Sequence, residues 1–208
     1  MTESWPAPGP AADERPVLAI GTGGGVVSGF ASVEEGEGLV RLGGSLMSLS
    51  PGEYKLWDAS QLAPAFGQLL TQASHAGVAE PAQILADLEM AGLVLIYSDE
   101  PSSADRVATG LTARLIGRLI GNGPHASPRY LVAAHASAPQ LAVDVLVYQF
   151  LLFADGRSSI AHVCTRIDTG KSGPDIDAVS HVASWIPRLL QAGLITLDLA
   201  DPADEALR

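Results

Sequence analysis

The sequence predicts an α+β fold in which one unit of about a hundred residues occurs twice, each unit having short strands, three helices and a returning strand. Two observations predict it. Three short blocks recur in the same order along the 208 residues. In addition, both copies have a residue typical of a helix N-cap, Ser50 or Asp144, at the same place in the second block. A tandem duplication explains both.

The first block predicts a strand that ends in a glycine turn. Residues 20–23 (IGTG) return as residues 120–123 (IGNG), an offset of 120 − 20 = 100. Both follow an apolar, strand-like stretch, and glycine permits the tight turn that such a junction needs. A dinucleotide-binding loop is disfavoured, because the third glycine of its pattern is missing and residues 27–30 make a poor helix start.

The second block marks the start of a helix in each copy. Residues 49–57 (LSPGEYKLW) align with residues 143–151 (VDVLVYQFL), an offset of 148 − 54 = 94. Ser50 and Asp144 are N-cap residues, whose side-chain oxygens accept hydrogen bonds from the first amides of a helix. Glu53 completes an S-x-x-E capping box with Ser50. We therefore expect helices directly after Ser50 and Asp144.

The third block predicts a helix, a glycine stop and a strand. Residues 85–96 (LADLEMAGLVLI) align with residues 186–197 (IPRLLQAGLITL), an offset of 193 − 92 = 101. Gly92 and Gly193 fit the left-handed position that ends a helix. The change of offset from 94 to 101 predicts an insertion in the second copy, at residues 168–174.

Each copy also has room for a middle helix between its second and third blocks. In the first copy residues 64–75 carry apolar side chains at helical spacing, and in the second Ser158 or Ser159 can cap a helix over residues 160–167. The proline and serines of residues 99–108 indicate a linker. The predicted organisation is a disordered tail (1–16), the first unit (17–98), the linker (99–108), the second unit (109–199) and an acidic tail (200–208).

Composition narrows the classes of function. A hydrophobic content of 47% allows real cores, and the longest apolar runs are too short and too polar to cross a membrane. With no secretory signal pattern, the cytoplasm is the expected compartment. The single cysteine, Cys164, excludes an internal disulfide, and the five histidines show no metal-ligand spacing, so we expect no metal and no cofactor. A net charge of −11 disfavours direct binding to a phosphate backbone.

The order of elements resembles a winged helix-turn-helix. The second copy resembles more narrowly the PqqD-like precursor-peptide recognition domains, through residues 153–161 (FADGRSSIA) and residues 189–195 (LLQAGLI). The resemblance implies a groove between the third strand and the third helix, where a peptide adds as a further strand. The matching elements would be residues 129–134 and residues 176–190.

The peptide-binding residues that this resemblance implies are Arg129, Leu131, Val132, His181 and Arg188. The two arginines would meet an acidic segment of the peptide; the alternative is that both are ordinary surface charges. The chain would then be a non-catalytic peptide- or protein-binding protein, a recognition subunit for a peptide-modifying enzyme (a RiPP recognition element).

Two other functions stay open. A winged-helix transcriptional regulator would read DNA with its third helix, yet residues 80–91 carry no lysine or arginine. An acidic scaffold of a larger complex is similar in architecture to the ScpB-like partners of chromosome-condensing complexes. An enzyme is disfavoured because no catalytic triad pattern is present, and Cys164 fits core packing. The sequence is compatible with a homodimer and does not identify the partner.

Overall fold

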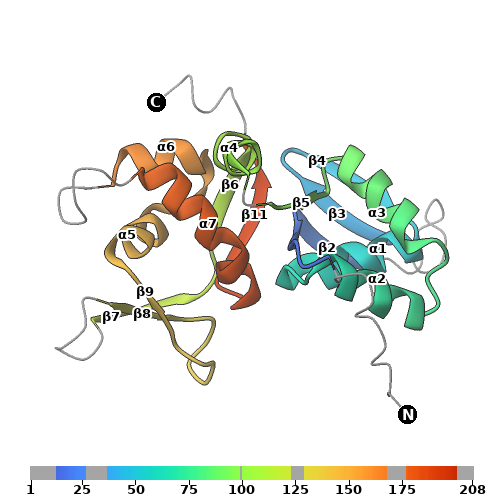
Figure 1. Ribbon diagram of the computed structural model, residues 1–208, viewed down its shortest axis with the longest axis horizontal. Coiled ribbons are helices and arrows are strands. Elements are labelled where there is room, and N and C mark those ends of the chain that lie inside the picture. Colours follow the sequence, from blue (N-terminus) through green and yellow to red (C-terminus); the bar gives the residue numbers. More distant parts are fainter. Residues whose placement is uncertain (1–12, 27–36, 99, 123–128, 168–176, 201–208) are drawn as a thin grey trace, which may run out of the picture.

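The structure of the chain, a computed structural model, describes residues 13–26, 37–98, 100–122, 129–167 and 177–200. It is the α+β fold that the sequence predicts, built from small antiparallel sheets and short helices. Two halves lie side by side, the first on the right of Figure 1 and the second on the left. None of the described helices is long and apolar enough to cross a membrane.

The first half combines two small sheets with helices. β1 pairs with β5, placing Leu18 opposite Leu95, and β2, β3 and β4 form a three-stranded meander. The elements in chain order are β1 (Val17–Ala19), β2 (Thr22–Val26), β3 (Gly38–Leu42), β4 (Ser45–Leu49), α1 (Pro51–Ala59), the 3-10 helix η1 (Ser60–Leu62), α2 (Phe66–His75), α3 (Pro81–Met90) and β5 (Val94–Ile96).

The second half has a related arrangement. β6 pairs with the last strand, β11, and β7, β8 and β9 form a second meander; β10 adds to the free side of β6. The elements in chain order are α4 (Pro101–Gly110), β6 (Leu111–Leu115), β7 (Arg118–Asn122), β8 (Tyr130–Ala133), β9 (Leu141–Val143), α5 (Val145–Phe153), β10 (Asp155–Ser159), α6 (Ile160–Thr165), α7 (Ala178–Gln191) and β11 (Ile195–Leu199).

Strand pairing corrects the first sequence block. Both meanders have an irregularity between their first two strands, at Gly23 to Gly25 in one half and at Leu119 to Gly121 in the other. Gly25 (φ 86°) and Gly121 (φ 109°) stand at these two irregularities, 121 − 25 = 96 positions apart. Gly21 (φ 97°) lies between β1 and β2, at the predicted glycine turn, whereas Gly121 lies within β7.

The predicted helix boundaries are confirmed where side-chain capping defines them. The Ser50 hydroxyl accepts from the Glu53 amide and the Glu53 carboxylate accepts from the Ser50 amide, which is the predicted capping box. Asp144 and Ser159 are the N-caps of α5 and α6, where their side chains accept from the amides of Val147 and His162. Gly92 (φ 74°) and Gly193 (φ 63°) follow the ends of α3 and α7, in the left-handed conformation that was expected of them.

The segment predicted as a linker is instead a helix. Pro101 occupies the first turn of α4, where its missing amide costs nothing, and the Ser103 hydroxyl accepts from the Ser98 amide. Ser103, Val107 and Ala108 are buried, and α4 packs against α6 and α7. Pro101 and Ser103 therefore lie in the first turn of a helix. The sequence analysis had interpreted them as part of a linker between two units.

Part of the predicted N-terminal tail is ordered. The backbone carbonyls of Asp13 and Arg15 accept from the amides of Gly67 and Phe66 at the start of α2. Because Ala65, the residue before α2, has no side chain that could cap these amides, the preceding chain satisfies them. The predicted insertion at 168–174 and the rest of both predicted tails lie outside the described residues.

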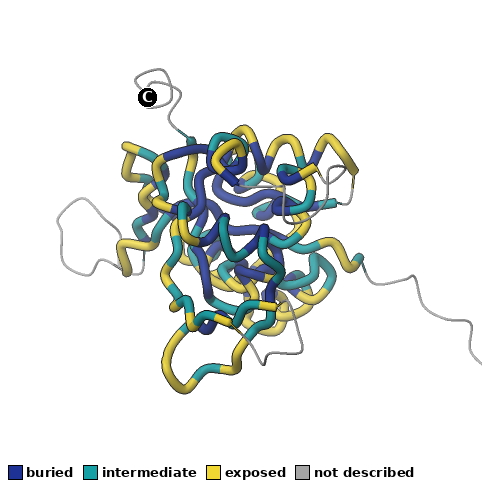
Figure 2. Tube along the Cα trace, turned by 90° about the vertical axis from the view of Figure 1, so that its left-hand side faces the viewer, coloured by how far each residue is buried: buried dark blue, intermediate teal, exposed yellow. Residues whose placement is uncertain are grey.

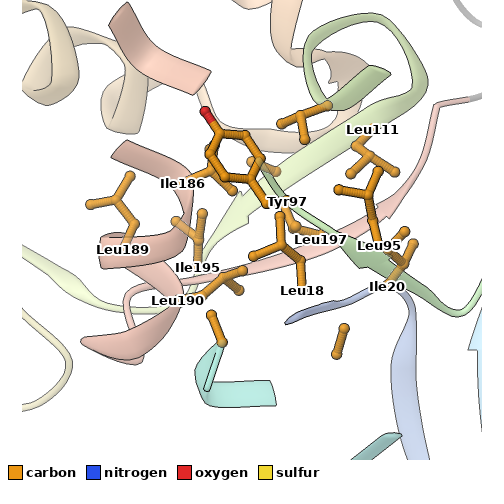
Figure 3. Close-up of a cluster of buried hydrophobic side chains, with 14 of the residues drawn as sticks. Leu18, Ile20, Leu95, Tyr97, Leu111, Ile186, Leu189, Leu190, Ile195 and Leu197 are labelled. Atoms are coloured by element: carbon orange, nitrogen blue, oxygen red, sulfur yellow. The ribbon is translucent and has the colours of Figure 1, made fainter. Parts of the chain in front are cut away.

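One cluster of buried hydrophobic side chains includes residues of both halves. Figure 2 shows the buried segments in the interior of the molecule, with exposed segments around them. Figure 3 shows Leu18, Leu95 and Tyr97 of the first half packed beside Ile186, Leu190 and Leu197 of the second. The halves are also joined by hydrogen bonds from the Gly21 amide to the Leu197 carbonyl (2.8 Å) and from the Gln191 side chain to the Ala63 carbonyl (3.1 Å).

Candidate functional site

A groove of about 330 Å³ lies between β9 and α7, in the region that the sequence analysis selected. β9 is the last strand of its meander, so among the described residues only β8 pairs with it, through one of its two edges. α7 forms the opposite wall. We call this site the β9–α7 groove; it is lined by Arg129, Ala142, Val143, Asp144, Trp185 and Arg188.

Asp144 holds the two walls of the groove together. One carboxylate oxygen accepts from the Val147 amide (3.0 Å) and so caps α5. The other lies 2.8 Å from Nε2 of His181 on α7. Because a single side chain bonds both helices immediately after β9 ends, it sets the spacing between the strand and α7. Both partners remain about one-third exposed, at 32% for His181 and 37% for Asp144.

The α7 wall presents an aromatic ring and a guanidinium group side by side. Trp185 is half-buried, and the Arg188 guanidinium carbon lies 5.1 Å from its ring centroid, within cation–π range. His181, Trp185 and Arg188 follow one another at positions i, i+4 and i+7, so they share one face of the helix. This face is a mixed aromatic and basic surface.

The N-terminus of α7 is fixed by Asp177. Its carboxylate accepts from the Ser180 hydroxyl (2.6 Å) and from the Val179 amide (3.0 Å). These hydrogen bonds, the one from the Ser180 side chain above all, hold the pKa of Asp177 below its ordinary value of 3.8. The carboxylate is therefore ionised at neutral pH and stabilises the amide end of the helix that lines the groove.

The groove contains two of the five predicted binding residues, and a third lies beside it. Arg129 and Arg188 line the groove, and His181 contacts it through Asp144. Leu131 lies half-buried in β8, whereas Val132 has no exposed surface and belongs to the core. Val132 cannot contact a ligand at the surface.

The predicted strand of the groove was also wrong. Residues 130–133 form β8, which is hydrogen-bonded to β7 on one side and to β9 on the other, so it has no free edge for a peptide. The third strand of the meander is β9. Sequence analysis missed its role because a strand of three residues has no recognisable pattern. Residue 176, the first residue of the predicted helical wall, lies outside the described residues.

Sequence analysis also missed Trp185 and Asp144 as groove residues. Asp144 was assigned only to a helix cap, and Trp185 was not included among the predicted binding residues. A signal for both was available. Trp185 stands three positions before Arg188 and four after His181, so the three side chains had to share a face.

Metal-binding side chains do not cluster in either half within the described ranges. No group of three or more histidine, cysteine, aspartate or glutamate side chains could hold a metal ion there. Cys164 is buried, as predicted, and burial together with the nearby Asp177 carboxylate raises the pKa of its thiol to about 12. At neutral pH this thiol is protonated and is a weak nucleophile.

The corresponding region of the first half has a different charge. Among the described strands β4, like β9, is an edge strand of its meander, and α3, like α7, is the helix that precedes the last strand of its half. However, α3 carries Asp87 and Glu89 and no basic residue, and Asp87 accepts from the Gln83 side chain (2.9 Å). An acidic ligand segment would therefore be attracted to the second half and repelled by the first.

Comparison with known proteins gives no information on the function of the chain. No family model, curated protein or solved structure matches the chain. The chemistry of the β9–α7 groove is therefore the basis for assigning a function.

Proposed function

We propose that the chain is a non-catalytic recognition protein that binds an extended peptide, or an extended segment of a partner protein, in the β9–α7 groove. One observation carries the proposal: the edge of β9 that no described strand pairs with lies beside Arg129 and Arg188. Within the described residues, neither Arg129 nor Arg188 makes an ion pair with a carboxylate. Such an edge and such charges suit a ligand that supplies backbone groups and acidic side chains.

In the proposed mode, the ligand adds to the sheet as a strand next to β9. The amides and carbonyls of residues 141–143 would pair with its backbone, which provides affinity with little dependence on sequence. Specificity would come from side chains of the ligand. Arg129 and Arg188 would bind a carboxylate, and the ring of Trp185 would cover an apolar side chain.

We also propose that each half is a winged-helix-like unit and that the two arose by tandem duplication. Three observations support this. Each half has a three-stranded meander followed by three helices, if η1 is counted as part of the turn after α1. Each meander has its irregularity at the equivalent position. In each half the strand that follows the third helix pairs with the first strand of that half's repeat.

A recognition subunit for a peptide-modifying enzyme is the role that fits this site best. In this role the groove would bind the peptide, and a separate partner enzyme would carry out the chemistry. A DNA-binding regulator is the alternative, and the third helices α3 and α7 argue against it. With only Arg188 and the weakly basic His181 between them, they offer few contacts to phosphate.

A random library of short displayed peptides tests the proposal. We expect enrichment of sequences that combine acidic and apolar residues, and backbone amide NMR shifts centred on residues 141–143 when an enriched peptide is added. The double variant R129A/R188A should bind that peptide more weakly by a factor of about ten or more, because two charge-assisted contacts are lost.

The matched control is R106A, which removes an exposed arginine from α4, away from the groove. It should bind the peptide as the wild type does. No enrichment, or equal weakening by R106A and R129A/R188A, would contradict the proposed groove. Binding to duplex DNA that falls steeply with added salt would instead support the regulator.

A further inference from the structure

A second, larger cavity lies where the two halves meet. It has a volume of about 480 Å³ and contains residues of both halves. Its floor is the sheet β10-β6-β11, and its wall is the β2–β3 ladder with the β3–β4 turn. We call it the inter-half cleft. The side chains important here are Thr22, Arg41, Thr112, Arg114, Arg157 and Thr196.

Strand register explains why these side chains share the cleft. Arg114 lies in the central strand β6, with Asp155 opposite it in β10 and Thr196 opposite it in β11. Thr112 is two residues from Arg114, so it points to the same face of the sheet. In the wall, Arg41 is the register partner of Thr22, and its Nε donates to the Thr22 hydroxyl (3.4 Å).

The cleft contains excess positive charge in an acidic protein. Three arginines and two aspartates line it, a net charge of +1, whereas the whole chain carries −11. None of the three guanidinium groups makes an ion pair with a carboxylate of the described part of the chain. Each has five N–H donors, so most of the hydrogen-bonding capacity of this cluster is available to a ligand.

The two aspartates of the cleft accept hydrogen bonds from the backbone. Asp198 Oδ1 accepts from the amides of Gly43 (2.6 Å) and Leu199 (2.9 Å). Asp155 Oδ1 accepts from the amides of Arg157 (2.8 Å) and Ser158 (3.2 Å). These carboxylates therefore hold the strand ends and turns in place, and the arginines are oriented by the sheet that results.

We propose that the inter-half cleft binds a compact phosphate compound that carries several negative charges. Guanidinium groups bind the tetrahedral oxyanions of phosphate in a bidentate manner, and the hydroxyls of Thr22 and Thr196 supply further donors. The Thr112 hydroxyl is buried and donates to the Asp198 carbonyl, so it supports the floor of the cleft. The volume lies within the range of small-molecule sites. The proposed site is separate from the β9–α7 groove, and it does not depend on the function proposed for that groove.

A ligand in this cleft would join the halves of the chain. Arg41 belongs to the first half, while Arg114 and Arg157 belong to the second. An anion bound by all three adds contacts across the boundary in the folded state only. By linkage, it raises the temperature of unfolding as its concentration rises.

The experiment is calorimetric titration of the full chain with tripolyphosphate in buffer of low ionic strength, with citrate as a polycarboxylate for comparison. We expect saturable binding of one tripolyphosphate per chain, tighter than that of citrate, and a higher unfolding temperature in its presence. R41Q and R114Q should each weaken binding by a factor of about ten, because each removes a charged contact.

R118Q is the matched control, since Arg118 is an exposed arginine of β7 that does not line the cleft. It should bind tripolyphosphate as the wild type does. Circular dichroism verifies folding, and R157Q on the edge strand β10 replaces R114Q if the latter does not fold. The proposal is overturned by the absence of saturable binding, by equal weakening in R118Q and R41Q, or by tighter binding of citrate.

Peptide titration of the same variants keeps the two proposals distinguishable. R41Q should leave binding of a library-selected peptide unchanged, and R129A/R188A should leave tripolyphosphate binding unchanged. Loss of tripolyphosphate binding in R129A/R188A would show that the anion binds in the β9–α7 groove, and it would overturn the assignment to the inter-half cleft.

Discussion

The backbone amide of Gly43 donates to the Asp198 carboxylate over 2.6 Å, which links the β3–β4 turn of the first half to the last strand of the second. The same oxygen accepts from the Leu199 amide. Gly43 and Asp198 are 155 positions apart in the chain. A side chain in one half thus terminates a turn in the other, next to the cleft that we propose as an anion site.

Asp198→Ala should destabilise the folded chain. It leaves the part-buried Gly43 amide without its acceptor, and we expect the free energy of unfolding to fall by about 1 to 3 kcal/mol. Chemical denaturation monitored by circular dichroism measures this change. Asp105→Ala removes an exposed carboxylate from α4 and should change stability by less than about 0.5 kcal/mol. Equal effects of the two substitutions would contradict a special role for Asp198.

Gly38→Ala should destabilise the first half by overpacking. A methyl group at position 38 would overlap the ring of Tyr54, which packs on β3, and we expect a loss of about 2 kcal/mol. Gly44→Ala is the control, because a methyl group there meets nothing within 4 Å.

A double substitution tests whether Tyr54 causes the loss at position 38. If the overlap is the cause, Tyr54→Ala removes it, and the double variant G38A/Y54A should be less destabilised than the sum of the two single variants. Additive free energies of unfolding would mean that another contact is responsible.

Cys164 should be unreactive in the folded chain. A thiol with its pKa raised from 9.0 to about 12 has a thiolate fraction about a thousandfold lower than an ordinary thiol at about pH 8. A chromogenic disulfide reagent should label it slowly in buffer and quickly in denaturant. Rapid labelling of the folded chain would contradict its burial.

The same thiol should make the stability of the folded chain depend on pH in the alkaline range. Because the folded state favours the neutral form, the contribution of the thiol is complete below pH 9.0 and is lost as pH rises toward about 12. Cys164→Ala should therefore lose less stability than the wild type over that range. Parallel pH profiles from denaturant titrations would contradict the shift.

The stability contribution of Asp177 should depend on pH in the opposite direction to that of Cys164. Its pKa is lowered in the folded state, so its contribution is present above about pH 3.8 and is lost as pH falls through the folded value. At neutral pH, Asp177→Ala should lower the free energy of unfolding by about 1 kcal/mol, the usual effect of losing an N-cap. The difference from the wild type should shrink in acid. Asp177→Asn, which keeps an acceptor oxygen, should lose less.

The features that sequence predicted correctly depend on interactions between residues near one another in the chain. Ser50 and Glu53 are three positions apart, and their side chains and amides satisfy each other without help from the rest of the molecule. Gly193 has its left-handed conformation because the helix before it must stop. Such chemistry can be read from a short segment, which is why these boundaries were found.

The features that sequence missed depend on distant partners. Whether β8 or β9 is the edge strand is decided by pairing across the sheet, and the two strands carry similar apolar residues. Pro101 and Ser103 suit a loop as well as a helix start. The helix forms because Val107 and Ala108 find a buried surface on elements formed more than 50 residues later in the chain, such as α6 and α7. The Gly43–Asp198 link has no signal in sequence at all.

The continuous core has a consequence for how the two halves can change over evolution. Leu18 and Leu95 of one half are packed against Leu190 and Leu197 of the other, so any enlargement on one side requires a matching reduction across the boundary. Deleting or replacing one half would therefore expose or mispack the buried side chains of the other half. Under the tandem duplication that we propose, each copy therefore restricts the core substitutions that the other can accept.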